Sequence, residues 1–151
     1  MPTDINNLAE KMRWLGTQRY NVATLIEVMR NSKRFADLSI DGEIISDDFA
    51  FIIACNTIHV GKGMKMAPKA IIDDGLVDII IVPKVNRLKL LKLFPKLFTG
   101  DHINSPELQY KQVNNFSIIP NENNKLNIDG ELLGTTPVKV KVLKKEIEVL
   151  I

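Results

Sequence analysis

The stretch Arg34-Phe35-Ala36-Asp37-Leu38-Ser39-Ile40-Asp41-Gly42-Glu43-Ile44-Ile45-Ser46 places short runs rich in Ile, Leu and Phe on both sides of an Asp-Gly pair. Such runs, bounded by turn residues, are typical of antiparallel strands. Asp-Gly accepts the positive φ values that a two-residue hairpin turn requires. We therefore predict strands at Phe35–Ile40 and Glu43–Ser46, joined by a hairpin turn at Asp41-Gly42.

Similar runs continue to the end of the chain, separated by clusters of Pro, Gly and Asn. They predict further strands near Phe49–Asn56, Val77–Pro83, Asn115–Pro120, Lys125–Asp129, Val138–Leu143 and Glu146–Ile151. Leu and Phe residues recur on one face of Asn86–Thr99 and predict a helix that Pro95 bends. Apolar residues at helical spacing also predict two helices before residue 34. The expected fold is α+β and mainly β: an antiparallel, β-sandwich-like domain with N-terminal helices and one inserted helix.

The composition indicates one soluble domain that spans residues 1–151. The chain has 151 residues and is 45% hydrophobic, enough for one core. The net charge of +2, from 20 basic and 18 acidic side chains, is too small to imply binding of nucleic acid. Cys55 is the only cysteine, which excludes an internal disulfide and fits a reducing compartment. No apolar run approaches the length of a membrane span, so we expect a cytoplasmic location.

The tripeptide Asp-Gly-Glu occurs twice, at residues 41–43 and 129–131. A turn explains both copies, because Asp-Gly suits positive φ. The second copy follows the alternating run Leu126-Asn127-Ile128 and directs two carboxylates out of the end of a predicted strand. Two acids placed in this way are also able to act in catalysis.

Asp73-Asp74-Gly75 is a second acidic turn with two interpretations. Paired acids before a glycine commonly form a loop that enters a strand. Alternatively, one oxygen-seeking cation, bound by a carboxylate and backbone carbonyls, would relieve the repulsion between the two acids. Gly61-Lys62-Gly63 is rich in glycine but lacks both common phosphate-loop patterns, so it is a weak candidate for binding phosphate.

The predicted middle helix is both basic and amphipathic. Its charged residues are Lys84, Arg87, Lys89, Lys92 and Lys96. Such a helix is able to lie on a membrane surface. We favour the simpler interpretation, in which its apolar face packs on the sheet and its lysines stay in water.

Three segments together resemble the C-terminal domain of the diacylglycerol kinase and sphingosine kinase lipid-kinase family. They are residues 61–78, residues 100–106 with Tyr110 beyond them, and residues 127–131. The resemblance implies a partner domain on the N-terminal side, with a Gly-Gly-Asp-Gly-Thr-type loop for the nucleotide. None of the eight glycines of this chain forms such a loop. The chain therefore resembles the second half of a lipid kinase, with the nucleotide-binding domain absent.

The resemblance also implies roles for individual residues. Glu131 would be the general base that takes the proton of the lipid hydroxyl, and Asp129 would orient the site or its metal. Asp74 would bind Mg²⁺, together with the backbone oxygens of Ile71 and Leu76. ATP would be held mostly by the missing domain.

These implications lead to a first hypothesis: the chain belongs to an ATP-dependent kinase that phosphorylates a hydroxyl of a diacylglycerol or sphingoid-base lipid. We expect peripheral association with a membrane and little or no activity of the chain alone. A second hypothesis is a non-catalytic module that docks on membranes through the basic helix or regulates a partner. A third is a half-domain that pairs with a separate nucleotide-binding chain, or forms a homo-oligomer through its uncovered apolar surface.

Overall fold

The computed structural model describes residues 34–61 and 63–147, and within these not the side chains of Arg87 and Leu91. The described part is mainly β, as predicted. Its strands are β1 (Arg34–Ile40), β2 (Glu43–Cys55), β3 (Val77–Pro83), β4 (Gln109–Val113), β5 (Asn115–Pro120), β6 (Lys125–Ile128), β7 (Glu131–Thr135) and β8 (Val138–Lys141). Its helices are α3 (Arg87–Leu93), α4 (Lys96–Thr99) and the 3₁₀ turn η2 (Asp101–Asn104). The helices predicted before residue 34 lie outside the described residues.

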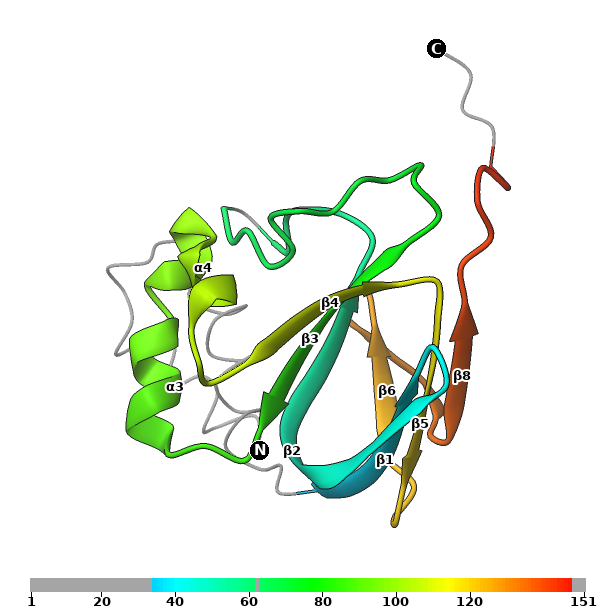
Figure 1. Cartoon of the computed structure of the whole chain (residues 1–151), viewed down its shortest axis with the longest axis horizontal. Helices are drawn as coiled ribbons and strands as arrows, with labels where there is room; N and C mark the ends of the chain where they lie inside the picture. Colours follow the sequence, from blue (N-terminus) through cyan, green and yellow to red (C-terminus); the bar gives the residue numbers. More distant parts are fainter. Residues whose placement is uncertain (1–33, 62, 148–151) are drawn as a thin grey trace.

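Six strands form one antiparallel sheet in the order β4-β3-β2-β1-β5-β8. The hairpin at Asp41-Gly42 is present as predicted, with Ile40 opposite Glu43. The strands β1 and β5 cross the direction of β2 and β3, so the sheet is strongly curved (Figure 1). At its two edges, β4 and β8 carry the lysines Lys111, Lys139 and Lys141, which disfavour pairing with a further strand.

The strand β3 has the sequence Val-Asp-Ile-Ile-Ile-Val-Pro, and it is buried on both faces. Val77, Ile79 and Ile81 pack in one core cluster with β1 and β5, on the inner side of the curved sheet. Ile80 and Val82 face the opposite way, into a second cluster that α3, α4 and the loop Met64–Ala70 cover. Side chains of successive strand residues point to opposite faces, so this single strand contributes to both cores.

The helices α3 and α4 lie along one face of the sheet (Figure 1). One helix over Asn86–Thr99 was predicted, with a bend at Pro95, and the structure corrects this to two helices separated by Phe94 and Pro95. Proline has no N–H for the helical ladder, and its ring clashes with the preceding turn. The Asn86 side chain caps α3, because its Oδ1 accepts from the Leu88 N–H at 3.0 Å.

Several predicted strands differ from those observed. The two strands Glu43–Ser46 and Phe49–Asn56 are one strand, β2, because the polar pair Asp47-Asp48 still pairs with β1. Lys125–Asp129 ends at Ile128 and Val138–Leu143 ends at Lys141. Glu146 and Ile147 are not in a strand, and the remainder of that predicted strand lies outside the described residues. Two strands, β4 and β7, were not predicted.

The strands β6 and β7 form a separate two-stranded ribbon. Every residue of β7 is exposed, including Leu132 and Leu133. At the base of the ribbon, Thr136 is buried, and its N–H donates to the Asn124 carbonyl at 2.8 Å. Its hydroxyl oxygen accepts from the Asn124 N–H at 2.8 Å. The ribbon is therefore fixed at its base and projects at its tip.

Among the described helices, none combines the length and the apolar character that crossing a membrane requires.

We predict that Ile79→Ala lowers the free energy of unfolding by about 2–5 kcal/mol, because it opens a cavity at a fully buried position of β3. Ile119→Ala is the matched control, since Ile119 is 55% exposed on the outside of β5, and its effect should stay within about 0.5 kcal/mol. Urea unfolding measures both variants. Equal effects would contradict the central position of β3.

Candidate functional site

Both Asp-Gly-Glu copies form the same turn. Asp41 and Gly42 have φ values of 47° and 92°, and Asp129 and Gly130 have 51° and 93°. Two central residues with positive φ define a type I′ hairpin, the turn whose twist suits antiparallel strands. In the second copy the Gly130 N–H donates to Asn127 Oδ1 at 3.0 Å, which fixes the turn further. Backbone geometry therefore does not distinguish the two copies.

The surroundings of the two glutamates do distinguish them. Glu43 lies 3.5 Å from the Lys111 ammonium, as an ion pair. Glu131 is exposed on the projecting ribbon, and in the described part of the chain neither it nor Asp129 has a salt-bridge partner. Exposed apolar neighbours flank Glu131, namely Ile128 opposite it and Leu132 next to it. The Glu131 carboxylate is thus exposed at the edge of an apolar surface.

The loop before β3 holds the residues that the resemblance connects with magnesium. Asp74 is half-buried, and its Oδ1 accepts from the Leu76 N–H at 2.8 Å. This bond draws the backbone of Leu76 toward the Asp74 side chain. Gly75 has a φ of 84°, and a Cβ built there would lie 3.1 Å from the Lys144 side chain, so both conformation and space favour glycine.

The donors in this loop suit a hard cation. Within the residues that the structure describes, no three side chains of His, Cys, Asp or Glu form a cluster that binds a metal. A cation at this loop would therefore need backbone carbonyls in addition to the Asp74 carboxylate. Mg²⁺ accepts such a set, because it commonly binds one or two carboxylates and retains several waters. No hydrogen bond or ion pair joins this loop to Asp129 or Glu131 in the described ranges.

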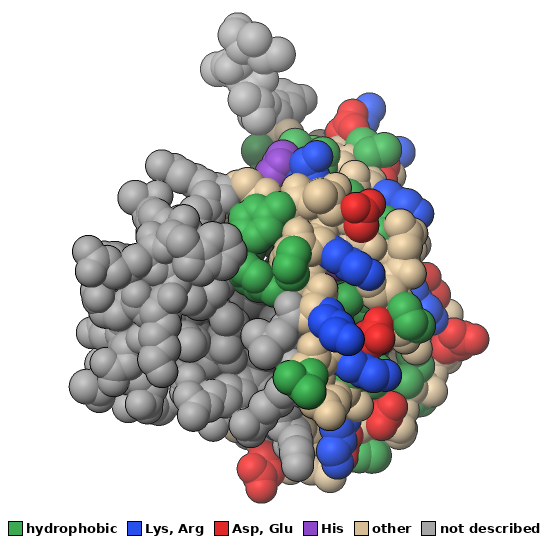
Figure 2. Space-filling view, turned by 90° about the vertical axis from the view of Figure 1, so that its left-hand side faces the viewer, with side chains coloured by type: hydrophobic (Ala, Val, Ile, Leu, Met, Phe, Trp, Pro, Cys, Tyr) green, Lys and Arg blue, Asp and Glu red, His purple; other side chains and the backbone are tan. Residues whose placement is uncertain are grey.

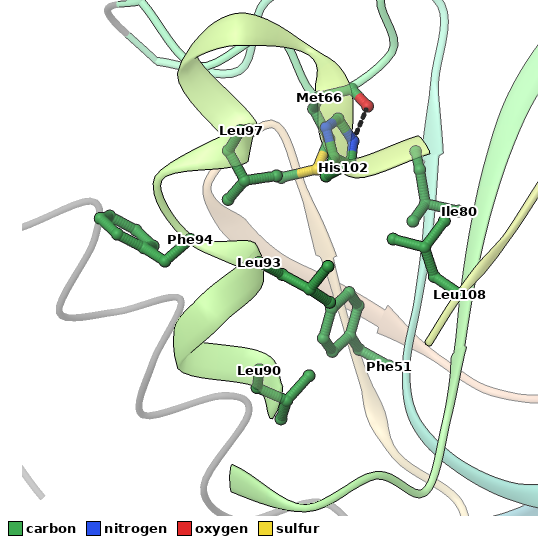
Figure 3. Close-up of a pocket in the computed structure, with 9 residues that line it drawn as sticks. All are labelled: Phe51, Met66, Ile80, Leu90, Leu93, Phe94, Leu97, His102 and Leu108. Atoms are coloured by element: carbon green, nitrogen blue, oxygen red, sulfur yellow. Dashed lines mark hydrogen bonds between the residues drawn. The ribbon is translucent and has the colours of Figure 1, made fainter. Parts of the chain in front are cut away.

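An apolar cavity lies between the sheet and the two helices (Figure 3). Leu90, Leu93 and Leu97 point from the helices toward the sheet side, where Phe51, Ile80 and Leu108 meet them (Figure 3). Its volume of about 20 Å³ is enough for roughly one water molecule or a methyl group. The apolar face of the two helices therefore packs on the sheet through Leu90, Leu93 and Leu97, with a gap in the packing, whereas Leu88 of the predicted face is exposed.

His102 lines one end of this cavity and is 1% exposed. Its Nε2 lies 3.0 Å from the Met66 carbonyl, to which it donates (Figure 3). Burial lowers the pKa of His102, and the carbonyls of Met66 and Lys96 and the charge of Asp101 partly offset this effect. The ring is therefore neutral near pH 7, and its buried Nδ1 has no hydrogen-bond partner among the residues that the structure describes. The Lys96 carbonyl near it already accepts from the Gly100 N–H at 2.9 Å.

A buried polar cluster adjoins the start of β3. Asp78 is 1% exposed, and its Oδ1 accepts a short hydrogen bond from the Tyr110 hydroxyl. Cys55 lies opposite Asp78 on β2 and is also buried. Burial, and then the hydrogen bond to Asp78, raise the pKa of Tyr110, so the phenol stays protonated. Sequence reasoning assigned no role to this cluster, because Tyr110 lies on β4, which carries no run of apolar residues.

The lysines of the helix face are partly neutralised. Lys84 lies 3.6 Å from the Asp48 carboxylate, and Lys89 lies 4.0 Å from that of Glu107. Figure 2 shows this face, on which basic and acidic side chains alternate. Leu88 is 66% exposed on α3. The surface is therefore mixed in charge, with an exposed apolar side chain among its lysines.

The family relationship follows from the sequence. The family described as the YegS C-terminal NAD kinase beta sandwich-like domain matches residues 2–151, and the chain belongs to this family. The predicted resemblance to the C-terminal domain of a lipid kinase is thereby confirmed.

Relatives and solved structures agree with this assignment. A diacylglycerol kinase from Mycobacterium tuberculosis is 32% identical over 154 residues, which cover 97% of this chain and 48% of that protein. A diacylglycerol kinase from Bacillus subtilis is 27% identical over 76% of this chain and 38% of its own length. The crystal structure of a diacylglycerol kinase from Bacillus anthracis has the same fold, with a TM-score of 0.69 and 22% identity over 90% of this chain and 46% of that one. The chain thus spans about half the length of these relatives or less.

The buried cluster predicts how stability depends on pH. Burial, and to a smaller extent the charge of Asp78, raise the pKa of the Cys55 thiol from 9.0 to about 11. Between these values the unfolded chain binds fewer protons than the folded chain, so the free energy of unfolding falls as pH rises. This contribution is complete below pH 9.0 and is lost as pH rises through about 11.

Urea unfolding across this pH range measures the fall. The free energy of unfolding should fall less steeply with pH in Cys55→Ala. Some fall should remain, because the raised pKa of Tyr110 contributes in the same direction. If the free energy of unfolding falls equally steeply with pH in both proteins, the raised pKa of the Cys55 thiol is contradicted.

Proposed function

We propose that this chain is the lipid-binding half of an ATP-dependent lipid kinase and supplies its general base. The substrate would be a lipid with a free hydroxyl, and the names of the relatives favour diacylglycerol over a sphingoid base. The observation that carries the proposal is the apolar cavity beneath α3 and α4, in a chain whose family relatives are named for this activity.

The cavity supports binding of a lipid chain because apolar side chains form nearly all of its lining. In its present form it is far too small for an acyl chain. Space would open if the helices moved outward, and their construction favours this movement. Each is short, and Pro95 interrupts the ladder between them. Leu93 and Leu97 would then exchange contacts with the sheet for contacts with the lipid.

Glu131 is proposed as the general base. Its carboxylate would take the proton of the lipid hydroxyl while the hydroxyl oxygen attacks the γ-phosphorus and ADP leaves. The exposed Ile128 and Leu132 beside it provide an apolar surface for the lipid. Asp129, held at the tip of the same turn, would orient the site or its metal.

The loop Ile71–Leu76 is the proposed site of Mg²⁺. Asp74 would contribute its carboxylate, and Ile71 and Leu76 would contribute only backbone carbonyls. When bound, the ion neutralises negative charge and fixes the loop. ATP would lie mostly on a separate nucleotide-binding domain outside residues 1–151, so these residues alone should transfer no phosphate.

A membrane is the proposed setting of the reaction. The helix α3 carries the exposed Leu88 and Lys92, and its Leu90 and Leu93 line the cavity, so an acyl chain leaving a bilayer would reach the cavity from the helix side. The ion pairs of Lys84 and Lys89 reduce the free positive charge of this surface. We therefore propose peripheral contact in which apolar insertion contributes alongside electrostatic attraction.

One prediction of this proposal concerns Glu131. In a protein that carries both halves, Glu131→Gln should lower kcat by about 10²–10⁴, the usual contribution of a general base. Glu43→Gln is the matched control, because Glu43 follows the same type I′ turn and should leave kcat unchanged. Transfer of labelled phosphate from ATP to diacylglycerol, with a sphingoid base compared, measures both. Undiminished turnover of Glu131→Gln, or robust turnover by residues 1–151 alone, would contradict the proposal.

Another prediction of this proposal concerns the cavity. Leu93→Phe should weaken binding of a short-chain diacylglycerol about tenfold, because the larger side chain fills the space that the lipid would enter. Ile119→Phe, at an exposed position of β5 that has no part in the proposed lipid site, should bind as the unchanged chain does. Calorimetric titration measures the affinities, and thermal unfolding checks that both variants fold. Equal affinities would exclude this cavity as the lipid site.

A further inference from the structure

We infer that Asp78, Tyr110 and Gln112 form a clamp that sets the shape of the proposed magnesium loop, and that they act as positioning residues for the cation. This inference rests on the proposed function, because it takes Ile71, Asp74 and Leu76 as the ligands. None of the three clamp residues is itself proposed as a ligand.

The two ends of the loop are held by the same strand. On the upstream side, the Lys69 N–H donates to the Tyr110 hydroxyl oxygen at 3.3 Å. The Lys69 carbonyl accepts from Gln112 Nε2 at 3.1 Å. Tyr110 and Gln112 are two residues apart on β4, so they point to the same face. Both backbone polar groups of Lys69 are thus bound by neighbouring side chains of one strand.

The downstream end joins the same network. Asp78 is the second residue of β3, two positions after Leu76, and its Oδ1 accepts from the Tyr110 hydroxyl. The Tyr110 oxygen therefore connects Lys69 to Asp78, on opposite sides of the ligand segment. A hydroxyl donates one hydrogen and accepts others, so it is able to make both bonds at once. Phenylalanine would keep the ring but lose both.

The span between these ends depends on few other contacts. Within the described part of the chain, residues 71–76 make one hydrogen bond, from the Leu76 N–H to the Asp74 carboxylate. Ile71 and Ile72 are 56% and 72% exposed, so packing restrains them little. The distance between Lys69 and Asp78 therefore decides whether the two carbonyls and the Asp74 carboxylate converge on one ion. Mg²⁺ is sensitive to this convergence, because it requires nearly ideal octahedral geometry.

The Asp78 side chain depends on Tyr110 for its position. Its carboxylate is buried without a salt-bridge partner in the described part of the chain, and its single recorded partner is a neutral phenol. The Lys69 ammonium lies 5.9 Å from the centre of the Tyr110 ring and does not reach Asp78 as an ion pair. Among the described side chains, the Tyr110 hydroxyl is therefore the hydrogen-bond partner that fixes Asp78 within the clamp.

Metal affinity tests the clamp. In the 151-residue chain, titration with Mn²⁺, followed by the electron paramagnetic resonance of the free ion, should show one site that Asp74→Asn abolishes. Tyr110→Phe should weaken this site about tenfold, as loss of a group that orients metal ligands commonly does. Gln112→Leu, at an exposed position that tolerates substitution, should weaken it in the same direction. Thr136→Val removes a buried hydrogen bond at the distant ribbon and should leave the affinity unchanged.

Thermal unfolding with and without Mn²⁺ separates positioning from simple stabilisation. A merely structural Tyr110 would lower both unfolding temperatures equally, whereas a positioning role reduces the increase that the metal causes. Folded Tyr110→Phe and Gln112→Leu variants with unchanged affinity would overturn the clamp and leave the metal site intact. Absence of saturable Mn²⁺ binding by the unchanged chain would overturn the metal site and the clamp together, and the lipid cavity would be unaffected.

Discussion

Burial of β3 on both faces is the constraint on which the rest of this structure depends. A strand that carries Ile79 and Ile81 on one side and Ile80 and Val82 on the other must be covered twice. The curved sheet covers the first side with β1 and β5, and the helices with their loops cover the second. An antiparallel sheet commonly buries one face and leaves the other in water. Because β3 is apolar on both faces, elements must pack on both sides of it, and this requirement determines where they lie.

The two covers of β3 differ in stiffness. The inner side is closed by paired strands, whose backbone hydrogen bonds are shared with their neighbours. The outer side is closed by two short helices that Pro95 separates, and the packing gap lies on this side. A core of this kind is able to admit a ligand where its cover is discontinuous. The cavity therefore lies under the discontinuous cover, while the loop that precedes β3 is attached to a strand that is paired on both sides.

Much of the fold could be predicted from local patterns. Val77–Pro83 and Asn115–Pro120 have the predicted bounds, because apolar runs flanked by turn residues leave little choice. The strand β4 was missed since Gln-Tyr-Lys-Gln-Val contains no such run. It lies at the edge of the sheet, where polar side chains protect against further pairing, and its Tyr110 and Gln112 bind a loop instead of filling a core. Pattern rules based on burial do not detect a strand of this type.

The candidate site shows a different limit of sequence reasoning. Local physics predicted a turn for each Asp-Gly-Glu, and both turns are type I′ with nearly equal angles. The difference between Glu43 and Glu131 arises from tertiary neighbours: one pairs with Lys111, and the other projects on a ribbon beside apolar side chains. Only the resemblance of the whole chain to a family gave the second copy a role before the structure was known. The environment of a carboxylate therefore matters more than its motif, since the same turn precedes an ion-paired glutamate in one place and, within the described residues, a glutamate without an ion-pair partner in the other.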